Sequence, residues 1–346
     1  MLQLADVFEE FREVSKRIYD LDPAYYISAP QLSWDAMLKI TGAKIELIHD
    51  SAMFTMIDSG IRGGVSMITT RYAKANTPSM GAAFDPTLPR GEIKGLDANN
   101  LYGHAMSTYL PEKGYEWVVG EELQNINWLE QTDTQPIGYI VKVDLEYPKE
   151  LHEKHTDFPL APERIHVHDK MYSQKQVDIK SQYNIGRSDL TAKLIPNLMD
   201  KKEYVVHYRN LKFYLEHGLK LTKVHAAIKF QQSDWMKPYI SLNQLMRMNA
   251  TNEFEIEFFK LMNNTVFGKT CENQKKRTSI HLVNSQENFL KWTQKPQLMD
   301  VRVFGEDLAA IELQKSQLWI NKPFQVGFTI LDEAKLTMYR YELELF

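Results

Sequence analysis

The sequence contains very little cysteine: Cys271 is the only one among 346 residues. A single cysteine excludes an intramolecular disulfide framework and a cysteine-rich zinc site, and it favours a reducing compartment. No run of about 18 apolar residues occurs, so we expect no transmembrane helix and no membrane partner. The N-terminal stretch is acidic from Asp6 onward and does not resemble a signal peptide. We expect an intracellular location, with nucleus and cytoplasm both open.

The chain also lacks an excess of charge of one sign, since 41 Lys and Arg face 45 Asp and Glu, a formal net charge of -4. This balance excludes a protein that coats nucleic acid by bulk positive charge, but it leaves room for a local basic groove. Hydrophobic residues make up 43% and charged residues 25%, the usual globular proportion. A chain of this length predicts two or three domains.

The spacing of apolar residues predicts the main elements of secondary structure. The predicted elements are a helix over 4–18 that Asp22-Pro23 ends, a helix from Ser33 over 34–39, a short strand before Asp97, a strand over 137–147, short helices and strands over 204–228, a helix over 250–268, strand-like and loop-like pieces over 278–320, and a helix after Val326. Loops are expected over 76–95 and 148–200. The first helix is apolar from its start and the last has no capping glycine or proline, so we expect the chain to be cut at both ends.

The first group of residues with a chemical pattern surrounds Asp97. Mg²⁺ prefers carboxylate and carbonyl oxygens, which the Asp97 side chain and the Ala98 backbone carbonyl can supply. Tyr102 follows five residues later, where its ring can stack under a sugar. An aspartate that caps the next helix is the simpler interpretation of Asp97, and it stays open here.

The second group lies on the helix predicted over 250–268. Lys260, Asn264 and Phe267 share one helix face, and they offer the cation, amide and aromatic ring that a nucleoside triphosphate needs. Gly268 permits close approach of a ligand. An amphipathic helix with an exposed lysine is the alternative. In the stretch Ile61-Arg62-Gly63-Gly64, two glycines allow the backbone to approach a phosphate chain, but an ordinary turn explains them equally well.

Three other groups have competing interpretations. Asp144 and Glu146 share one strand face and could form a metal-binding nuclease pair, or simply a solvated face. Four histidines in a polar loop are spaced for zinc or are plain surface residues: His152, His155, His166 and His168. A basic run after the helix could track phosphates or form a solvated turn: Lys269, Lys275, Lys276 and Arg277.

Taken together, these motifs resemble those of a known enzyme family. Asp97-Ala98-Asn99-Asn100-Leu101-Tyr102 resembles the first palm motif of family B DNA polymerases, and Lys260 to Gly268 resembles their fingers motif. Ile61 to Gly64 resembles the Tyr-x-Gly-Gly element that links their exonuclease and polymerase regions. Order and spacing agree, and the resemblance is to the protein-primed branch found in linear plasmids, bacteriophages, and self-synthesising DNA transposons or related viruses. Stretches such as LSWDAML and YVVHYRNLKFYLEHGL resemble the transposon and virus group specifically.

The resemblance implies an α+β fold, a partial right-hand polymerase with a palm sheet fragment, helical fingers and two mixed insertions. The implied domains are 1–110 as the N-terminal palm part with the exonuclease-palm linker, 111–240 as an insertion like terminal-protein region 1, 241–273 as fingers, 274–320 as an insertion like terminal-protein region 2, and 321–346 as a return to the palm.

The resemblance also implies functional roles. Asp97, with the Ala98 carbonyl, would be one of two aspartates that hold Mg²⁺ or Mn²⁺ for two-metal deoxynucleotidyl transfer. The implied nucleotide-binding residues are Leu101, Tyr102, Lys260, Asn264, Phe267 and, more weakly, Arg247. The implied DNA-binding residues are Arg62, Gly63, Gly64, Gly268 and Lys269. The implied partners are primer-template DNA, deoxynucleoside triphosphates and a terminal priming protein.

Several positions depart from the family pattern. The second aspartate motif, usually Asp-Thr-Asp, does not follow Leu331, where the chain ends DEAKLTMYRYELELF. Ile61 stands where many members have Tyr, Gly103 where many have Pro, and Phe267 where Tyr is commoner. We therefore expect this chain by itself to lack normal polymerase turnover. The alternative is a non-catalytic nucleic-acid-binding remnant of a transposon or virus polymerase gene.

Overall fold

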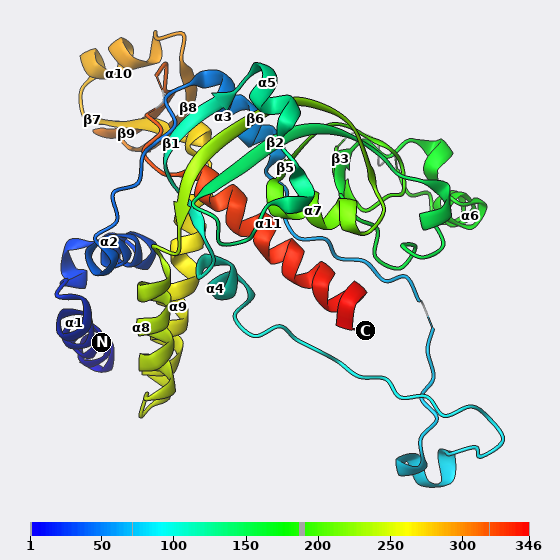
Figure 1. Ribbon diagram of the computed structural model, residues 1–346. Coiled ribbons are helices and arrows are strands. Elements are labelled where there is room, and N and C mark those ends of the chain that lie inside the picture. Colours follow the sequence, from blue (N-terminus) through cyan, green and yellow to red (C-terminus); the bar gives the residue numbers. More distant parts are fainter. Residues whose placement is uncertain (1, 71, 187–190, 318, 346) are drawn as a thin grey trace.

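A four-stranded antiparallel sheet forms the centre of the molecule (Figure 1). The structure, a computed structural model, describes residues 2–70, 72–186, 191–317 and 319–345. The sheet contains β1 Leu110–Val118, β2 Ile137–Glu146, β5 Lys201–His207 and β6 Lys220–Ser233 in the order β1-β6-β2-β5. The strand predicted over 137–147 is confirmed as β2, which pairs with both β5 and β6. All four strands of this central sheet lie almost entirely within the range assigned to a first insertion, 111–240.

Helices cover both faces of this sheet because its strands are apolar on both sides. Ile140 packs toward α3 Ser51–Gly60, whereas Val141 and Val143 pack toward α7 Tyr208–Glu216. The last helix, α11 Phe324–Arg340, contributes side chains to both clusters and crosses the view diagonally in Figure 1. Where α3 packs against α11, residue 60 must be glycine, because a Cβ there would lie 2.7 Å from the Phe328 ring.

A buried ion pair connects α11 to the sheet. The Arg209 guanidinium is 3.0 Å from Glu333 Oε1 and donates to the carbonyls of Tyr109 and Asp133. Both side chains are almost completely buried. Removing one partner of such a pair leaves an uncompensated buried charge, which costs about 3–5 kcal/mol. The pair therefore fixes the position of α11 relative to β1 and the loop that precedes β2.

A separate group of helices packs beside the sheet, at the left of Figure 1. It contains α1 Leu2–Tyr19, α2 Ala29–Thr41, α4 Leu101–Met106, α8 Lys237–Met248 and α9 Glu253–Thr270. The predicted helices over 4–18 and 250–268 are confirmed as α1 and α9. The second predicted helix begins at Ala29 rather than Ser33, because Pro30 fits the first turn of a helix.

One predicted core position of α9 is wrong. Helical spacing predicts an apolar side made of Phe254, Phe258, Leu261, Met262 and Val266, but Leu261 is 44% exposed. The buried arc of the helix instead runs through Phe258, Met262 and Val266. At 100° per residue Leu261 lies well outside this arc, so it faces solvent.

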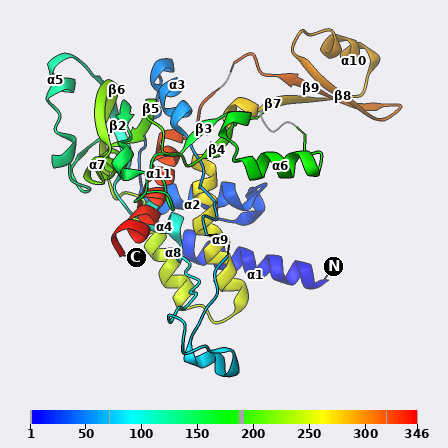
Figure 2. The ribbon, with the colours of Figure 1, turned by 90° about the vertical axis from the view of Figure 1, so that its right-hand side faces the viewer.

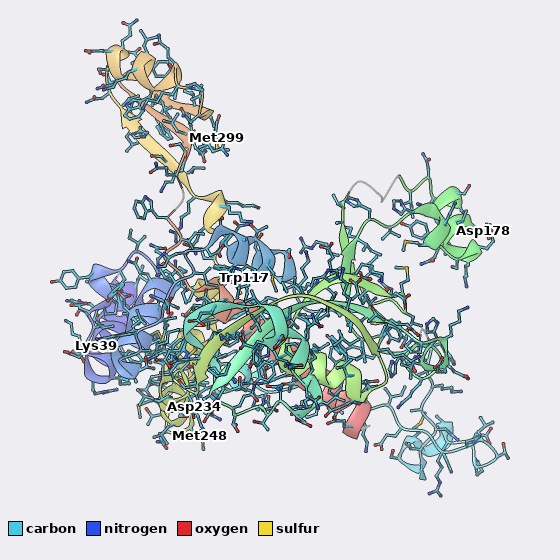
Figure 3. The ribbon with its side chains drawn as sticks, turned by 45° about the horizontal axis from the view of Figure 1, so that its top comes forward. Lys39, Trp117, Asp178, Asp234, Met248 and Met299 are labelled. Atoms are coloured by element: carbon cyan, nitrogen blue, oxygen red, sulfur yellow. The ribbon has the colours of Figure 1, made fainter. Side chains whose placement is uncertain are left out.

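Two small units extend from the main body, and Figure 3 labels one residue in each, Asp178 and Met299. The first contains β3 Glu163–Ile165, α6 Gln174–Gln182 and β4 Lys193–Ile195. The second contains β7 Thr278–Val283, α10 Gln286–Thr293, β8 Leu298–Gly305 and β9 Leu308–Gln314, and it projects from the body in Figure 2. The strand-like character predicted over 278–320 is confirmed, but α10, which the Ser285 side chain caps, was not predicted.

The stretch between α3 and α4 runs away from the body as an extended arm (Figure 1). Its tip is closed by Asn76, which bridges to Gly91 and donates to the carbonyl of Asp85. Residues 92–98 have no regular structure, so the strand predicted before Asp97 is wrong. A strand needs a neighbour to complete its hydrogen bonds, and no described strand pairs with this segment.

Short elements complete the description. They are α5 Gly120–Asn125, the 3₁₀ turns Pro23–Tyr25, Pro78–Ala83, Trp128–Glu130, Lys149–Leu151, Asp169–Met171 and Gln274–Lys276, and a π-helical turn at Tyr341–Leu345. Throughout the described part of the chain, no helix has the length and apolar character needed to cross a membrane.

Candidate functional site

A cavity of about 410 Å³ lies where four distant parts of the chain meet, one of them represented by Phe158 alone. Asp97 and Ala98 line it together with Leu101 and Tyr102, and Gly64 comes from the stretch after α3. The far wall belongs to α11, which contributes five residues: Leu331, Ala334, Lys335, Met338 and Tyr339. Four of the predicted metal and nucleotide residues and one predicted DNA residue are thus brought to one place.

Asp97 itself is exposed at the edge of this cavity. Its carboxylate accepts no hydrogen bond from the described residues, and it does not cap α4, because Asn100 holds the N-cap position in a left-handed conformation with φ of 53°. Helix capping therefore does not explain Asp97. Gly103, the position where many family B members have Pro, leaves room for the Asn100 side chain, which a Cβ would meet at 2.0 Å.

Two aromatic rings join this cavity to α9. The rings of Tyr102 and Phe267 are stacked, with centroids 4.2 Å apart and planes at 12°. Both side chains are half-buried. Parallel stacking at this distance contributes about 0.5–1.5 kcal/mol beyond area burial. The stack places the predicted face of α9 directly beside the Asp97 segment.

The rest of that face continues along α9 as an exposed stripe. Asn264 and Lys260 are exposed, and among the described residues Lys260 forms an i,i+3 ion pair with Glu257 alone, at 3.1 Å. Lys260 lies seven residues from Phe267, about 10 Å along the helix. Arg247 does not join them: it lies in the last turn of α8, near the tip of the α8–α9 pair.

A buried polar network sets the rotation of α9. Tyr19 Oη donates to Asn243 Oδ1 at 2.5 Å, and Asn243 Nδ2 donates to Asn263 Oδ1 at 2.7 Å. Burial raises the pKa of the Tyr19 hydroxyl, so it stays protonated as a donor. Because Asn263 is tied inward, its neighbour Asn264 must face outward. This network was not predicted, although a pair of asparagines in a helix is a usable signal of one buried and one exposed amide.

The predicted DNA-binding residues divide into two groups. Arg62 is used within the fold: its guanidinium donates to the Val205 carbonyl at 2.7 Å and lies 3.9 Å from the centroid of the Tyr204 ring. Gly63 and Gly64 have open space where a Cβ would be, and so does Gly268. Lys269 is half-buried and pairs with Glu272 at 3.3 Å.

Lys335 was not predicted to belong to this region. Its ammonium, almost buried in the cavity wall, donates to the Arg62 carbonyl at 2.7 Å and is 3.2 Å from Asp332. Burial lowers the pKa of Lys335, and Asp332 opposes that shift. The signal in the sequence was the charged run Asp332-Glu333-Ala334-Lys335 inside an otherwise apolar helix, which requires buried partners.

The competing metal groups are explained by the fold. Asp144 accepts from the Glu203 backbone N–H and from His225 Nε2, both at 2.8 Å, and these bonds lower its pKa to about 2. Glu146 pairs with Lys220 across the sheet. His155 is buried against the Tyr147 hydroxyl. Within residues 2–70, 72–186, 191–317 and 319–345, no three His, Cys, Asp or Glu side chains gather into a group suited to a metal ion.

Comparison with known proteins relates this arrangement to one polymerase. No family model matches the sequence, and no curated protein matches it. Among solved structures, Phi29 DNA polymerase complexed with primer-template DNA is similar over 90% of this chain, with a TM-score of 0.51 and 14% identity. An orthorhombic crystal form of Phi29 DNA polymerase is similar over 92%, with a TM-score of 0.50 and 12% identity. The chain spans 44% and 46% of those two chains. The fold is therefore similar to part of a DNA polymerase.

Proposed function

We propose that this chain is the palm and fingers region of a DNA polymerase of the protein-primed family B type, and that it binds primer-template DNA and an incoming deoxynucleoside triphosphate. The observation that carries the proposal is the stack of Tyr102 on Phe267 beside Asp97. Two motifs distant in the sequence meet there, which supports the proposal. The similarity of fold to Phi29 DNA polymerase supports the same conclusion.

Each group at the site has a chemical task in this proposal. The Lys260 ammonium binds the triphosphate, because its partner within the described part of the chain is an exposed carboxylate that an anion of higher charge can displace. Asn264 and Phe267 line the base, and Tyr102 lies under the sugar. With ring centroids 4.2 Å apart, no base fits between Tyr102 and Phe267, so a nucleotide binds beside the pair or separates it.

The residues present do not fit a two-metal centre on their own. When bound, Mg²⁺ or Mn²⁺ would stabilise the charge on the attacking and leaving oxygens, and the two ions would lie about 3.5–4 Å apart. The cavity offers one carboxylate, Asp97, and the neighbouring Ala98 carbonyl. On α11, which forms the far wall, the Asp332 carboxylate is already paired with the Lys335 ammonium at 3.2 Å. We therefore expect nucleotide and DNA binding from this chain, without normal turnover.

The single carboxylate also favours the second candidate function, a nucleic-acid-binding protein without catalysis. The two candidates differ in nucleotide selection. A polymerase-type site binds the triphosphate that is complementary to the template base, and this raises the affinity for primer-template. The affinity of a simple nucleic-acid-binding surface for primer-template does not change when the complementary nucleotide is added.

Fluorescence anisotropy with a labelled primer-template tests the proposal directly. We expect the complementary triphosphate, with Mg²⁺, to tighten DNA binding, and Lys260→Ala to weaken nucleotide binding about tenfold, the effect of one charge-assisted hydrogen bond. Lys237→Ala is the matched control, since Lys237 is similarly exposed and also forms an i,i+3 ion pair, with Asp234. Equal binding of all four triphosphates, or equal effects of the two substitutions, would contradict the proposal.

A primer-extension assay with Mg²⁺ and with Mn²⁺ accompanies this measurement. We expect no extension by the chain alone. Extension that Asp97→Ala abolishes would show that one carboxylate suffices, and it would correct the expectation about turnover.

A further inference from the structure

A group of positive charges lies where the C-terminal end of α9 meets the base of the β7–β9–β8 unit. Glu272 lies at its centre and pairs with two cations: Arg277 Nη2 at 2.8 Å and Lys269 Nζ at 3.3 Å. Lys322, just before α11, is the third cation. We call Lys269, Arg277 and Lys322 the cation cluster. Three positive charges here share one carboxylate.

The position of Lys322 is fixed by its neighbours. Gln274, a buried side chain, accepts from the Asn321 N–H at 2.8 Å and donates to the Lys322 carbonyl at 3.4 Å. Arg277 Nη1 donates to Asn321 Oδ1 at 3.0 Å. The Lys322 ammonium lies 4.6 Å from the centroid of the Trp34 ring. These contacts hold it beside Arg277 at little further cost in side-chain entropy.

The charge of Lys322 is not neutralised locally. No carboxylate of the described residues lies within 4.0 Å of its ammonium, and only Asp35 and Glu272 attract it from farther away. Burial lowers the pKa of Lys322, and repulsion by Lys269 and Arg277 adds to this shift. Lys275 differs, since its ammonium is 2.5 Å from Asp58 and its charge is paired.

The cation cluster lies outside the Asp97 cavity. Lys269 follows Thr265 by one helical turn, and Thr265 Oγ1 bonds to Ser33 Oγ of α2, so this side of α9 faces α2. Phe267 points elsewhere, onto Tyr102. An anion bound by the cluster is therefore distinct from a nucleotide bound beside Tyr102.

We propose that the cation cluster binds a backbone phosphate of a nucleic acid strand as the strand passes the C-terminal end of α9. This inference rests on the proposed function. One planar guanidinium and two ammonium groups can donate hydrogen bonds to the oxygens of a phosphate group. Trp34 is buried, so its ring face contacts the Lys322 ammonium and does not stack on a base.

The salt dependence of primer-template binding by the full chain tests this site. Each phosphate contact contributes about 0.7–0.9 to the slope of log K against log salt concentration. Lys322→Ala should therefore reduce the slope by about one and weaken binding severalfold. Lys220→Ala is the matched control: Lys220 is a surface lysine paired with Glu146 on the central sheet, and its removal should leave the slope unchanged.

A second variant should change the affinity for primer-template in the opposite direction. Glu272→Gln removes the shared carboxylate and frees Lys269 and Arg277, so binding should become tighter by severalfold. A purely structural role for Glu272 would give weaker binding instead. Thermal unfolding of each variant confirms that the fold is kept.

The possible results separate the two proposals. If the chain binds primer-template but Lys322→Ala leaves the slope unchanged, the phosphate site is wrong and the proposed function stands. If the chain does not bind primer-template, both fail. Pyrophosphate titrated by calorimetry is the second arm: if Lys322→Ala weakens pyrophosphate binding without changing the DNA slope, the cluster recognises a free anion, and the strand assignment is overturned.

Discussion

The strand β2 and the segment 92–98 invite comparison, because the sequence predicted both as strands that carry an aspartate. β2 lies between β5 and β6, and its Asp144 accepts hydrogen bonds from Glu203 and His225. The segment 92–98 has no pairing strand, and its Asp97 accepts no hydrogen bond from the described residues. Strand pairing thus determines what each carboxylate contacts. Asp144 forms hydrogen bonds within the paired strands, whereas Asp97 remains accessible to a ligand.

The largest difference should appear when matched leucines next to the two aspartates are truncated. Leu145 is 1% exposed in the core beneath β2, and Leu96 is 69% exposed. Leu145→Ala should cost about 2–5 kcal/mol of unfolding free energy through lost burial and a cavity. Leu96→Ala should change it by less than about 0.5 kcal/mol. Urea unfolding measures both, and similar losses would show that 92–98 is packed.

Neighbouring asparagines on α9 allow the same contrast within one helix. Asn263→Leu removes the acceptor for the buried Asn243 amide, so it should cost about 1–3 kcal/mol of unfolding free energy. Asn264→Leu changes an exposed position and should stay within about 0.5 kcal/mol. Thermal or urea unfolding of the two variants checks this. A reversed order would mean that the rotation assigned to α9 is wrong.

A smaller effect concerns the link between α9 and the Asp97 segment. A double-mutant cycle of Tyr102→Ala and Phe267→Ala should give a coupling energy of about 0.5–1.5 kcal/mol, as expected for stacked rings. Tyr102→Phe keeps the ring and should preserve the coupling. Additive single effects, with no coupling, would show that the two rings do not meet in solution.

The smallest predicted effect is a pH dependence that comes from Asp144. Its folded pKa of about 2 is below the ordinary value of 3.8, mainly because the Glu203 N–H stabilises the charged form. The resulting stability is therefore present above about pH 4 and is lost as the pH falls toward 2. Asp144→Asn should show a smaller loss of stability over this range in urea unfolding. An unchanged acid transition would contradict the assigned hydrogen bonds.

The sequence predicted the long helices α1, α9 and α11 because a helix makes its own hydrogen bonds, but it missed shorter ones such as α6, in a range predicted as loop, and α10. The apolar spacing of α1 and α9 indicates which residues face inward, and Pro30 accounts for the earlier start of α2. β2 was predicted from alternation alone. The strand before Asp97 failed because strand formation depends on a partner elsewhere in the chain, which no local pattern reveals.

The candidate site was predictable only in part. The face formed by Lys260, Asn264 and Phe267 follows from helical spacing, and the resemblance to polymerase motifs paired it with Asp97. That Phe267 stacks on Tyr102 could not be read from spacing, since it depends on how α4 and α9 pack. The DNA contact of Arg62 stays a prediction. That its guanidinium donates to the Val205 carbonyl of β5, 143 residues away, could not be read from the sequence.

The most direct test of the central claim is a photo-crosslinking experiment with a photoreactive deoxynucleoside triphosphate, Mg²⁺ and primer-template, followed by mass spectrometry of the modified peptides. We predict crosslinks to peptides that contain Tyr102 or residues 260–268, formed only when the nucleotide is complementary to the template base. Crosslinks elsewhere, or crosslinks that form equally with a mismatched template, would contradict a polymerase-type nucleotide site.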